Sequence, residues 1–392
     1  MDLPTVAIPS GLPVPGGDAH AHGLRVQAML RERIQAAGGW LPFEDWMQAA
    51  LYAPGLGYYS AGSGKFGGQG DFITAPEAGH LFGQALARQV AQVLRACDSM
   101  QVLEFGAGSG ALAETLIPAL HDLGQSVDYR IIELSADLRA RQAGRLAHWG
   151  DAVQWLDALP EDFSGCVIAN EVLDAMPAAL LRWNAEGAVE VLGVALDGQP
   201  DAPCPFRWAV RPAPAELAGS LAERMPPLPG YRTELNRQAE AWVRHMGRWL
   251  ARGAALLIDY GFPQAEFYHP QRAQGTLMCH FRHHAHDQAL ILAGLQDITT
   301  HVDFTAMADA ALAGGLDVLG YASQARFLMN AGLAGLIQAP GEDPAARARL
   351  LAEVNTLTSE AEMGELFKVL AVGRGLDEPL LGFVRGDRRD RL

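Results

Sequence analysis

Short apolar runs separated by longer amphipathic segments dominate the middle of the chain. A run of four to eight mostly apolar residues bounded by polar residues or glycine is typical of a buried strand, and apolar residues three and four apart are typical of a helix. This pattern predicts seven strands, at 101–105, 127–133, 153–156, 166–170, 255–261, 316–321 and 366–374. Strands that alternate with helices form a parallel α/β sheet, which binds ligands at the carboxyl ends of its strands.

Other segments surround this predicted sheet. We expect a disordered tail over residues 1–22, rich in proline and glycine, and an N-terminal helical and glycine-rich cap region over 23–96. The sheet core spans 97–376, with an insertion on the substrate side at 177–251, and residues 377–392 form a C-terminal tail. Further elements predicted here are helices at 24–37, 42–51, 77–96, 232–252 and 324–330, and a hairpin at 181–196.

The segment 51–83 combines many glycines with aromatic residues. Eight glycines between Gly55 and Gly79 are interleaved with residues such as Tyr58, Tyr59 and Phe66. A flexible linker does not carry aromatic residues in this way. The segment therefore predicts a shaped loop that folds over a ligand, with a loop that packs on the core as the alternative.

A glycine turn lies between the first strand and the next helix. Gly106, Gly108 and Gly110 follow strand 101–105, and an apolar-periodic helix is predicted from Ser109 to Pro118. Glycine permits unusual backbone angles and close approach to a ligand, and the start of a helix offers N–H groups to an anion. The turn predicts a nucleotide-binding site.

Two acidic residues bear on which nucleotide binds. Glu104 lies two residues before the first glycine, where it would repel the pyrophosphate of a dinucleotide but attract the ammonium of S-adenosylmethionine. Glu133 ends the second strand, where a carboxylate accepts hydrogen bonds from both ribose hydroxyls. A solvated acid at the end of a strand is the alternative for Glu133. The sequence therefore favours S-adenosylmethionine as the cofactor.

Polar side chains also follow the fourth strand. Asn170, Glu171 and Asp174 come directly after strand 166–170, beside the place where the donor's methyl group is expected. We interpret them as catalytic candidates, and acids that cap the next helix are the alternative. The four histidines His280, His283, His284 and His286 are not expected to bind a catalytic metal, because no cysteine ligand is well placed and Arg282 lies among them.

Composition limits the classes of function. The 392 residues are 49% hydrophobic and carry a net charge of −15, which argues against nucleic-acid binding and is compatible with a basic substrate. The four cysteines are far apart and do not indicate a disulfide framework. No apolar run is long enough to cross a membrane, and no secretory signal is apparent. We expect a cytoplasmic enzyme.

Several motifs occur in a fixed order between about residues 43 and 374. They are LYAPGLGYYS, GDFITAPE, LEFGAGSG, IELS, NEVLDAMP, LIDYG, GTL, QDITTHVDF, SQARFL and MGELFKVLAV. In this ordered set the chain resembles the MidA-like family of class I S-adenosylmethionine-dependent methyltransferases, whose mitochondrial member methylates an arginine of a respiratory complex I subunit. The resemblance implies a Rossmann-like sheet of seven strands with a reversed last strand.

The resemblance also implies functions for individual residues. Gly106, Gly108, Gly110 and Glu133 would bind the donor, and the motif GDFITAPE adds Asp71, Thr74 and Pro76 to the expected donor site. The glycine loop of the family commonly has Pro, Arg and Thr where this chain has Ala107, Ser109 and Ala111.

The acceptor implied by the resemblance is an arginine of a partner protein, such as a complex I subunit, and Glu171 would orient it. The alternatives are a small-molecule methyltransferase and an assembly factor that binds the donor without catalysis. The oligomeric state stays open, with a homodimer as one option.

Overall fold

The computed structural model describes residues 3–4, 6–61, 74–198, 204–337 and 343–392. The chain forms two compact units, each built from three segments of the sequence. The first unit comprises Met1–Phe72, Asp174–Ala239 and Gln264–His301. The second unit comprises Ile73–Leu173, Glu240–Pro263 and Val302–Leu392.

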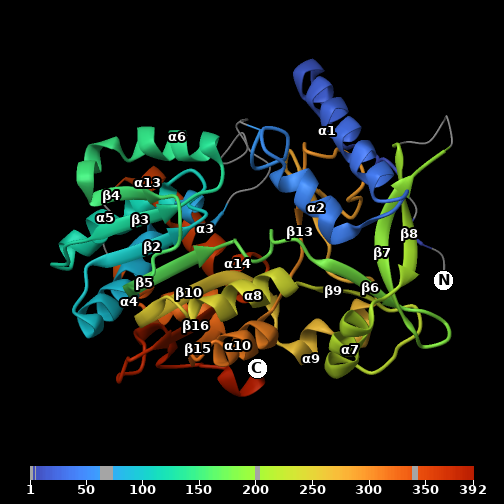
Figure 1. Cartoon of the computed structure of the whole chain (residues 1–392). Helices are drawn as coiled ribbons and strands as arrows, with labels where there is room; N and C mark the ends of the chain where they lie inside the picture. The colour runs from blue at the N-terminus through green and yellow to red at the C-terminus, as the bar shows by residue number, and fades with distance from the viewer. Residues whose placement is uncertain (1–2, 5, 62–73, 199–203, 338–342) are drawn as a thin grey trace. The chain divides into compact units, whose positions relative to one another are not determined.

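A mixed sheet of eight strands forms the centre of the second unit (Figure 1). Its strand order is β15-β16-β10-β5-β2-β3-β4, and β14 pairs with the end of β10. Strands β4, β3, β2, β5 and β10 are parallel to one another, whereas β16 is antiparallel to both β10 and β15. The strands are β2 (Gln101–Phe105), β3 (Asp128–Ile132), β4 (Val153–Leu156), β5 (Phe163–Asn170), β10 (Leu250–Phe262), β14 (Val302–Asp303), β15 (Asp317–Ser323) and β16 (Phe367–Arg374).

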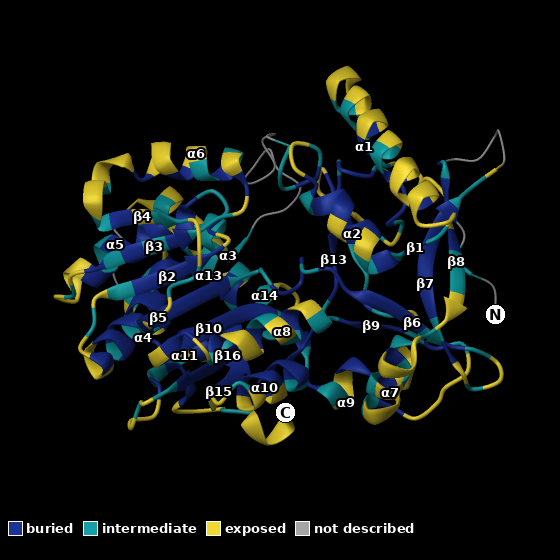
Figure 2. Cartoon of the chain, in the orientation of Figure 1, coloured by how far each residue is buried: buried dark blue, intermediate teal, exposed yellow. Residues whose placement is uncertain are grey.

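Helices cover this sheet and bury its strands (Figure 2). One face packs against α4 (Leu81–Cys97) and α5 (Ala111–Asp122), because side chains such as Val90 and Leu116 join the apolar core of Val102, Ile131 and Ile168. Side chains along β2 alternate between the two faces of the sheet. Phe105 points to the face opposite Val102, and its ring centroid lies 4.9 Å from that of Trp242. The remaining helices of this unit are α3 (Ala75–Ala78), α6 (Ala136–Arg145), α10 (Phe304–Ala313), α11 (Gln324–Asn330), α12 (Leu333–Leu336), α13 (Pro344–Thr358) and α14 (Met363–Leu366).

The first unit has its own sheets and its own core. An antiparallel sheet has the order β1-β7-β6-β9, with β8 paired to β7, and a second sheet has the order β12-β11-β13. The apolar faces of α1 and α2 pack with these strands around Trp46, Phe206 and Ile298. The elements are α1 (Gly17–Ala36), β1 (Leu41–Pro42), α2 (Phe43–Tyr52), β6 (Ala179–Trp183), β7 (Val189–Leu196), β8 (Phe206–Pro212), α7 (Ala215–Arg224), β9 (Arg232–Leu235), α9 (Gln264–Phe267), β11 (Met278–Phe281), β12 (His284–His286) and β13 (Asp297–Thr299). Helix α8 (Arg237–Met246) begins in this unit and continues into the second.

All seven predicted strands are present, and the bounds of β2 and β4 agree with the prediction. The predicted hairpin corresponds to β6 and β7, and the predicted helix 324–330 is α11. The strands β5, β10 and β16 were predictable because each contains a compact apolar run that is buried on both faces of the sheet.

Several predicted helix bounds were wrong. Helix α1 begins at Gly17, so the predicted disordered tail 1–22 extends too far into the chain. The predicted helix 77–96 is divided into α3 and α4 by Gly79, where a Cβ atom would lie 2.2 Å from the Glu353 carboxyl group. Helix α5 continues through Pro118 to Asp122 because the buried residues on both sides of the proline hold it against the core. Proline costs a helix one hydrogen bond, and burial offsets that cost here.

The predicted insertion 177–251 also differs from the structure. Residues Arg232–Leu235 form strand β9, since pairing with β6 outweighs their helical pattern. The chain already enters the second unit at Glu240, and the later segment Gln264–His301 belongs with the first unit. The insertion was therefore one of two segments that complete the first unit.

The C-terminal segment 377–392 packs against the second unit. Leu380 and Phe383 are buried in its core, and the phenyl ring of Phe383 contacts that of Phe327 at a centroid distance of 5.4 Å. The side chain of Gln89 accepts a hydrogen bond from the backbone N–H of Gly382 at 2.8 Å, and that of Gln92 accepts one from Leu381 at 2.7 Å. The segment is part of the fold and not a loose tail.

We expect Phe383→Ala to lower the free energy of unfolding by about 3–5 kcal/mol, because it removes a buried aromatic ring and leaves a cavity. Urea unfolding followed by circular dichroism measures this change. The neighbouring Val384 is 57% exposed, so Val384→Ala is the control and is expected to change stability by about 0.5 kcal/mol or less. Equal stability of the two variants would contradict the packing of this segment.

Candidate functional site

The glycine turn follows β2 at the carboxyl edge of the sheet. Gly106, Gly108 and Gly110 have φ angles of 62°, 55° and 82°, in the left-handed region that glycine adopts without steric cost. The Gly106 N–H donates to the carbonyl oxygen of Ile132 at 3.0 Å, which fixes the start of the turn to β3. A Cβ atom on Gly108 would meet no described atom within 4 Å. The turn is therefore fixed to the sheet and leaves room for a ligand at Gly108.

Glu104 points into the interior of the second unit. Its side chain is 3% exposed, and its Oε2 accepts a hydrogen bond from the Tyr129 hydroxyl at 2.7 Å. Burial raises the pKa of Glu104 to about 7; the hydrogen bond from Tyr129 lowers this pKa, and the nearby charge of Glu133 raises it. A carboxyl group with such a pKa changes its charge readily when a cation binds beside it.

Glu133 follows β3 and is held by the N–H groups of Ser135, Gln142 and Leu134. Its Oε1 accepts from the backbone N–H of Ser135 at 2.9 Å, and its Oε2 accepts from the side-chain amide of Gln142 at 3.0 Å. Burial raises the pKa of Glu133, and these hydrogen bonds oppose that effect. The two carboxylate oxygens together have four lone pairs, so the carboxylate still has acceptor capacity beside these contacts. The geometry suits the two hydroxyl groups of a ribose.

Leu134 is the next residue, and its side chain is 83% exposed. An exposed leucine directly after Glu133 offers an apolar surface to a ligand. We did not predict this residue. The sequence pattern that could have indicated it is an apolar residue directly after the acid at the end of the predicted strand.

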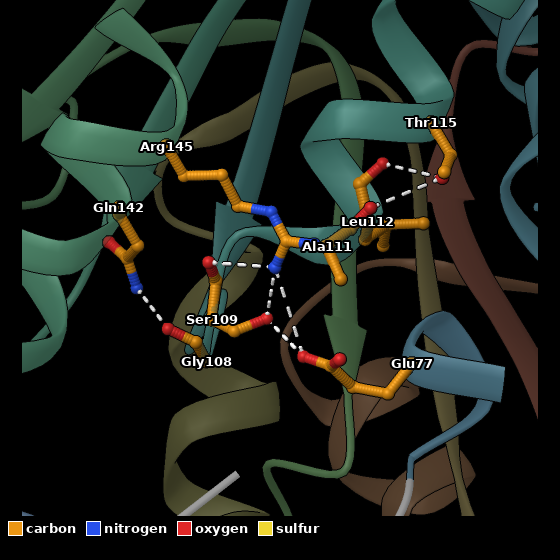
Figure 3. A network of polar contacts seen from close by, with 8 residues as sticks. All are labelled: Glu77, Gly108, Ser109, Ala111, Leu112, Thr115, Gln142 and Arg145. Carbon is orange, nitrogen blue, oxygen red and sulfur yellow. Dashed lines mark hydrogen bonds and ion pairs between the residues drawn. The ribbon is translucent and has the colours of Figure 1, made fainter. Parts of the chain in front are cut away.

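A second polar network joins α3, the glycine turn and α6 (Figure 3). The Ser109 hydroxyl donates to Glu77 of α3, and Arg145 Nη1 donates to Ser109 Oγ at 2.7 Å. Arg145 and Glu77 also form an ion pair at 3.9 Å. The turn itself contains no arginine, and the guanidinium group that contacts it is that of Arg145 on α6.

The network connects the predicted donor motif GDFITAPE with the turn. Thr74 and Pro76 lie in the same short segment as Glu77, with Thr74 directly before α3. Asp71 lies outside the described residues, as does much of the glycine-rich segment 51–83. Their expected functions stay predictions.

Asn170 and Glu171 lie at the carboxyl end of β5. Asn170 Nδ2 donates to Glu171 Oε1 at 3.1 Å, and Asn170 Oδ1 is buried without a hydrogen-bond partner among the described residues. Glu171 has a φ of 53°, which is unusual for a residue other than glycine. Its N–H donates to the carbonyl oxygen of Ile258 at 2.9 Å, so the adjacent strand β10 holds it in this conformation.

Asp174 belongs to the first unit and is 4% exposed. The Thr300 N–H donates to its carbonyl oxygen at 3.0 Å. Burial and the charges of Asp297 and Asp174 raise the pKa of Tyr59, whose hydroxyl donates to Asp297 Oδ1 at 2.8 Å. Two acids and the predicted loop tyrosine Tyr59 thus come together in this unit.

The four histidines lie on or beside a hairpin of the first unit. Strands β11 and β12 pair around a two-residue turn, Arg282 and His283, in which both φ angles are positive. His286 lies at the end of β12, and burial lowers its pKa. Among the residues with described positions, no three His, Cys, Asp or Glu side chains are placed to hold a metal ion. All four cysteines are buried free thiols.

Comparisons with known proteins relate these features to a family. The model of the family described as "Putative S-adenosyl-L-methionine-dependent methyltransferase" matches residues 85–322. "Protein arginine methyltransferase NDUFAF7, mitochondrial" of Danio rerio is 28% identical over 371 residues, which cover 86% of this chain and 84% of that protein. The homolog of Drosophila melanogaster is 28% identical over 401 residues, which cover 90% of this chain and 87% of that protein.

A solved structure gives the same relationship in three dimensions. The crystal structure of a Burkholderia thailandensis protein bound to S-adenosyl-homocysteine matches with a TM-score of 0.92 and 50% sequence identity. The match covers 97% of this chain and 100% of that chain. The chain has a methyltransferase-like α/β fold with a mixed central sheet.

We expect Gly108→Ala to weaken the binding of S-adenosylhomocysteine by at least about tenfold, because the added methyl group fills the open side of the turn and strains the backbone. Isothermal titration calorimetry measures the affinity. Gly124→Ala is the matched control: Gly124 also has positive φ and open space around its Cβ position, but it follows the other end of α5. Equal loss of affinity in both variants would show that the effect is general destabilisation.

Proposed function

Because the chain belongs to the family of S-adenosyl-L-methionine-dependent methyltransferases whose model matches residues 85–322, we propose that it methylates an arginine side chain of a partner protein. The relatives from Danio rerio and Drosophila melanogaster are named protein arginine methyltransferases. The observation that carries the proposal is the strained, hydrogen-bonded Glu171 at the carboxyl end of β5. A carboxylate there suits a cationic acceptor.

We propose that the donor lies along the carboxyl ends of β2 and β3. The open turn at Gly108 and the helix start behind it suit the donor's carboxylate. Glu104 suits the ammonium group, and Glu133 suits the ribose hydroxyls. When bound, S-adenosylmethionine supplies a methyl group that its sulfonium already activates, so the residues of the chain mainly have to position the acceptor.

We also propose that the sheet is the class I methyltransferase sheet, with seven strands and a reversed last strand. The strand order and the antiparallel pairing of β16 with both neighbours support this proposal. The two-residue strand β14 is then an addition at the end of β10.

Glu171 can orient a guanidinium group in a way that favours transfer. An arginine side chain is cationic at any cellular pH, and its delocalised lone pairs make it a poor nucleophile. A carboxylate that accepts hydrogen bonds from two of its nitrogens leaves the third directed at the methyl group. The same contact stabilises the charge that develops during transfer. Asn170 fixes Glu171, and Asp174, three residues further on, is the weaker candidate.

Two other functions remain as outcomes of a direct test. A small-molecule methyltransferase would methylate a metabolite, and a donor-binding assembly factor would methylate nothing. Incubation with radiolabelled S-adenosylmethionine and a cell extract separates these cases, and mass spectrometry then locates methyl-arginine. A complex I subunit as the partner and a cytoplasmic location are proposals that derive from the sequence.

Among the residues that the structure describes, every helix is too short or too polar to cross a lipid bilayer.

We expect S-adenosylhomocysteine to bind about fivefold to tenfold more weakly at pH 6 than at pH 7.5. The pKa of Glu104 is raised to about 7, so most of this carboxyl group is protonated at pH 6. The ammonium group favours the ionised form, and binding at pH 6 therefore has to expel a proton. Calorimetry in buffers of different ionisation enthalpy measures the protons released. Glu104→Gln is expected to remove this proton release, and an unchanged release in that variant would contradict the contact.

We expect Glu171→Gln to leave donor binding nearly intact and to lower turnover by roughly 10²–10³, the size of effect seen when one preorganised electrostatic contact is lost. Radiolabelled methyl transfer to a protein acceptor measures the rate. Glu161→Gln, at an exposed position before β5, is the control. A wild-type rate for Glu171→Gln, or methylation of a metabolite alone, would overturn the arginine acceptor and leave the donor assignment in place.

A further inference from the structure

Gln142 on α6 connects the two halves of the proposed donor site. Its side chain is fully buried, and its Nε2 donates two hydrogen bonds. One goes to the carbonyl oxygen of Gly108 at 2.9 Å, and the other goes to Oε2 of Glu133 at 3.0 Å. The glycine turn after β2 and the acid after β3 are therefore joined through one amide group. Figure 3 shows its contact with Gly108.

Trp155 on β4 fixes the orientation of this amide. The indole N–H of Trp155 donates to Gln142 Oε1 at 2.9 Å. The opposite orientation would place the amide oxygen against two acceptors and the amide nitrogen against a donor. Only one orientation satisfies all three partners, and both N–H groups of the amide are used in it.

We propose that Gln142 is a positioning residue for the donor, which holds the Glu133 carboxylate and the Gly108 peptide in the arrangement that binds the ribose and the amino-acid part of S-adenosylmethionine. This inference rests on the proposed function of Glu133 at the ribose. Nothing in the glycine motif or in the acid after β3 requires a glutamine at this place. The assignment comes from the geometry alone.

The contact acts on Glu133 in two ways. It occupies one lone pair of Oε2, beside the backbone N–H groups of Ser135 and Leu134, and so helps to fix the orientation of the carboxylate and of its remaining lone pairs. The hydrogen bond also favours the ionised carboxylate against the effect of burial. A ribose hydroxyl donates more strongly to an ionised carboxylate than to a neutral acid.

The contact with Gly108 acts on the turn. The C=O and N–H groups of a trans peptide point to opposite sides of its plane. Because Gln142 holds the Gly108 carbonyl group, the Ser109 N–H of the same peptide is turned away from α6. Gly108 alone has many accessible backbone conformations, and the hydrogen bond selects one of them.

Few charged groups surround Glu133. Glu104 on β2 interacts with it electrostatically. The arginines one turn away from Gln142 on α6 have other partners: Arg139 pairs with Asp157, and Arg145 pairs with Ser109 and Glu77. A change at Gln142 therefore acts on Glu133 without removing a neighbouring charge.

Two substitutions with opposite pH dependence test the inference. Gln142→Met keeps the length of the side chain and removes its hydrogen bonds, so Glu133 loses a donor and holds its proton to higher pH. We expect the affinity for S-adenosylhomocysteine, relative to the wild type at the same pH, to fall by about tenfold or more at pH 5.5 and to recover partly towards pH 8. Gln142→Glu can donate one proton to Glu133 at low pH but becomes a second negative charge at high pH. Its relative affinity is expected to fall as the pH rises.

Trp155→Phe is a further comparison: it removes one contact of the amide, but the two acceptors on Gly108 and Glu133 still select the same orientation. Its relative affinity is expected to change little with pH. The ratio to the wild type at each pH cancels the titration of Glu104. Calorimetry from pH 5.5 to pH 8, on protein shown to be folded by circular dichroism, provides the data.

Opposite slopes for the two Gln142 variants would support the positioning function. Losses that are equal at every pH, or wild-type affinity in both variants, would overturn it, because a merely structural glutamine has no reason to shift the pH dependence. Glu133→Ala separates this inference from its premise. If Glu133→Ala binds the donor as tightly as the wild type, the ribose function of Glu133 fails and the inference with it; if it binds weakly while the Gln142 variants show flat profiles, the inference alone is overturned.

Discussion

The parallel pairing of β2 with β3 and β5 is the constraint on which the candidate site depends. In this register Glu104 lies beside Ile131 on one side and Ile168 on the other, and Phe105 lies beside Ile132 and Ala169. Parallel strands end at the same edge of a sheet and lie about 4.8 Å apart. The residues that follow each strand therefore have to meet at one edge. The strand pairing therefore brings the glycine turn, Glu133 and Glu171 to the same edge of the sheet.

The same edge concentrates negative charge. It carries Glu104, one residue before the end of β2, and Glu133 and Glu171, which directly follow β3 and β5. Burial raises the pKa of Glu104 and of Glu133. Carboxylates that are partly desolvated lose hydration energy, which a bound cation can replace. S-adenosylmethionine carries an ammonium and a sulfonium against one carboxylate, so its net charge complements this edge. A dinucleotide pyrophosphate would add negative charge to it. The charge at this edge therefore favours S-adenosylmethionine, which is also the donor used by the family to which the chain belongs.

The sheet and the glycine turn could be predicted from the sequence because their signals are local. The strand 101–105 is a short, mostly apolar run, and the glycines at alternate positions after it mark left-handed backbone. Gln142 could not be predicted, since a glutamine on an amphipathic helix looks like a solvated residue until the fold places it between Gly108, Glu133 and Trp155. The division of the chain into two units could not be predicted from local sequence patterns either. Segments that are far apart in the sequence share one core, and no pattern within either segment shows which unit it joins.

The predicted helix 232–252 shows how pairing with a distant strand can override a local prediction. We predicted that residues Arg232–Leu235 begin this helix, but their backbone pairs with β6. A strand gains all its hydrogen bonds from a partner, so its formation depends on a neighbour that the local sequence does not contain.

The local backbone around Glu171 differs from that around Asp98, Arg282 and His283, which also have positive φ. Asp98 has positive φ because it ends α4, and Arg282 and His283 have positive φ because they form the turn of a two-residue hairpin. Such local structures favour the left-handed conformation. Glu171 lies in neither, and a left-handed residue with a side chain costs about 1–2 kcal/mol. Its conformation is maintained by β10 instead, through the carbonyl oxygen of Ile258 and through the Asp259 carboxylate, which accepts the Leu173 N–H at 3.0 Å. A glycine at position 171 would relieve the strain but would remove the carboxylate. The fold therefore maintains a strained backbone at the carboxylate that follows β5, which agrees with the acceptor-orienting function proposed for Glu171.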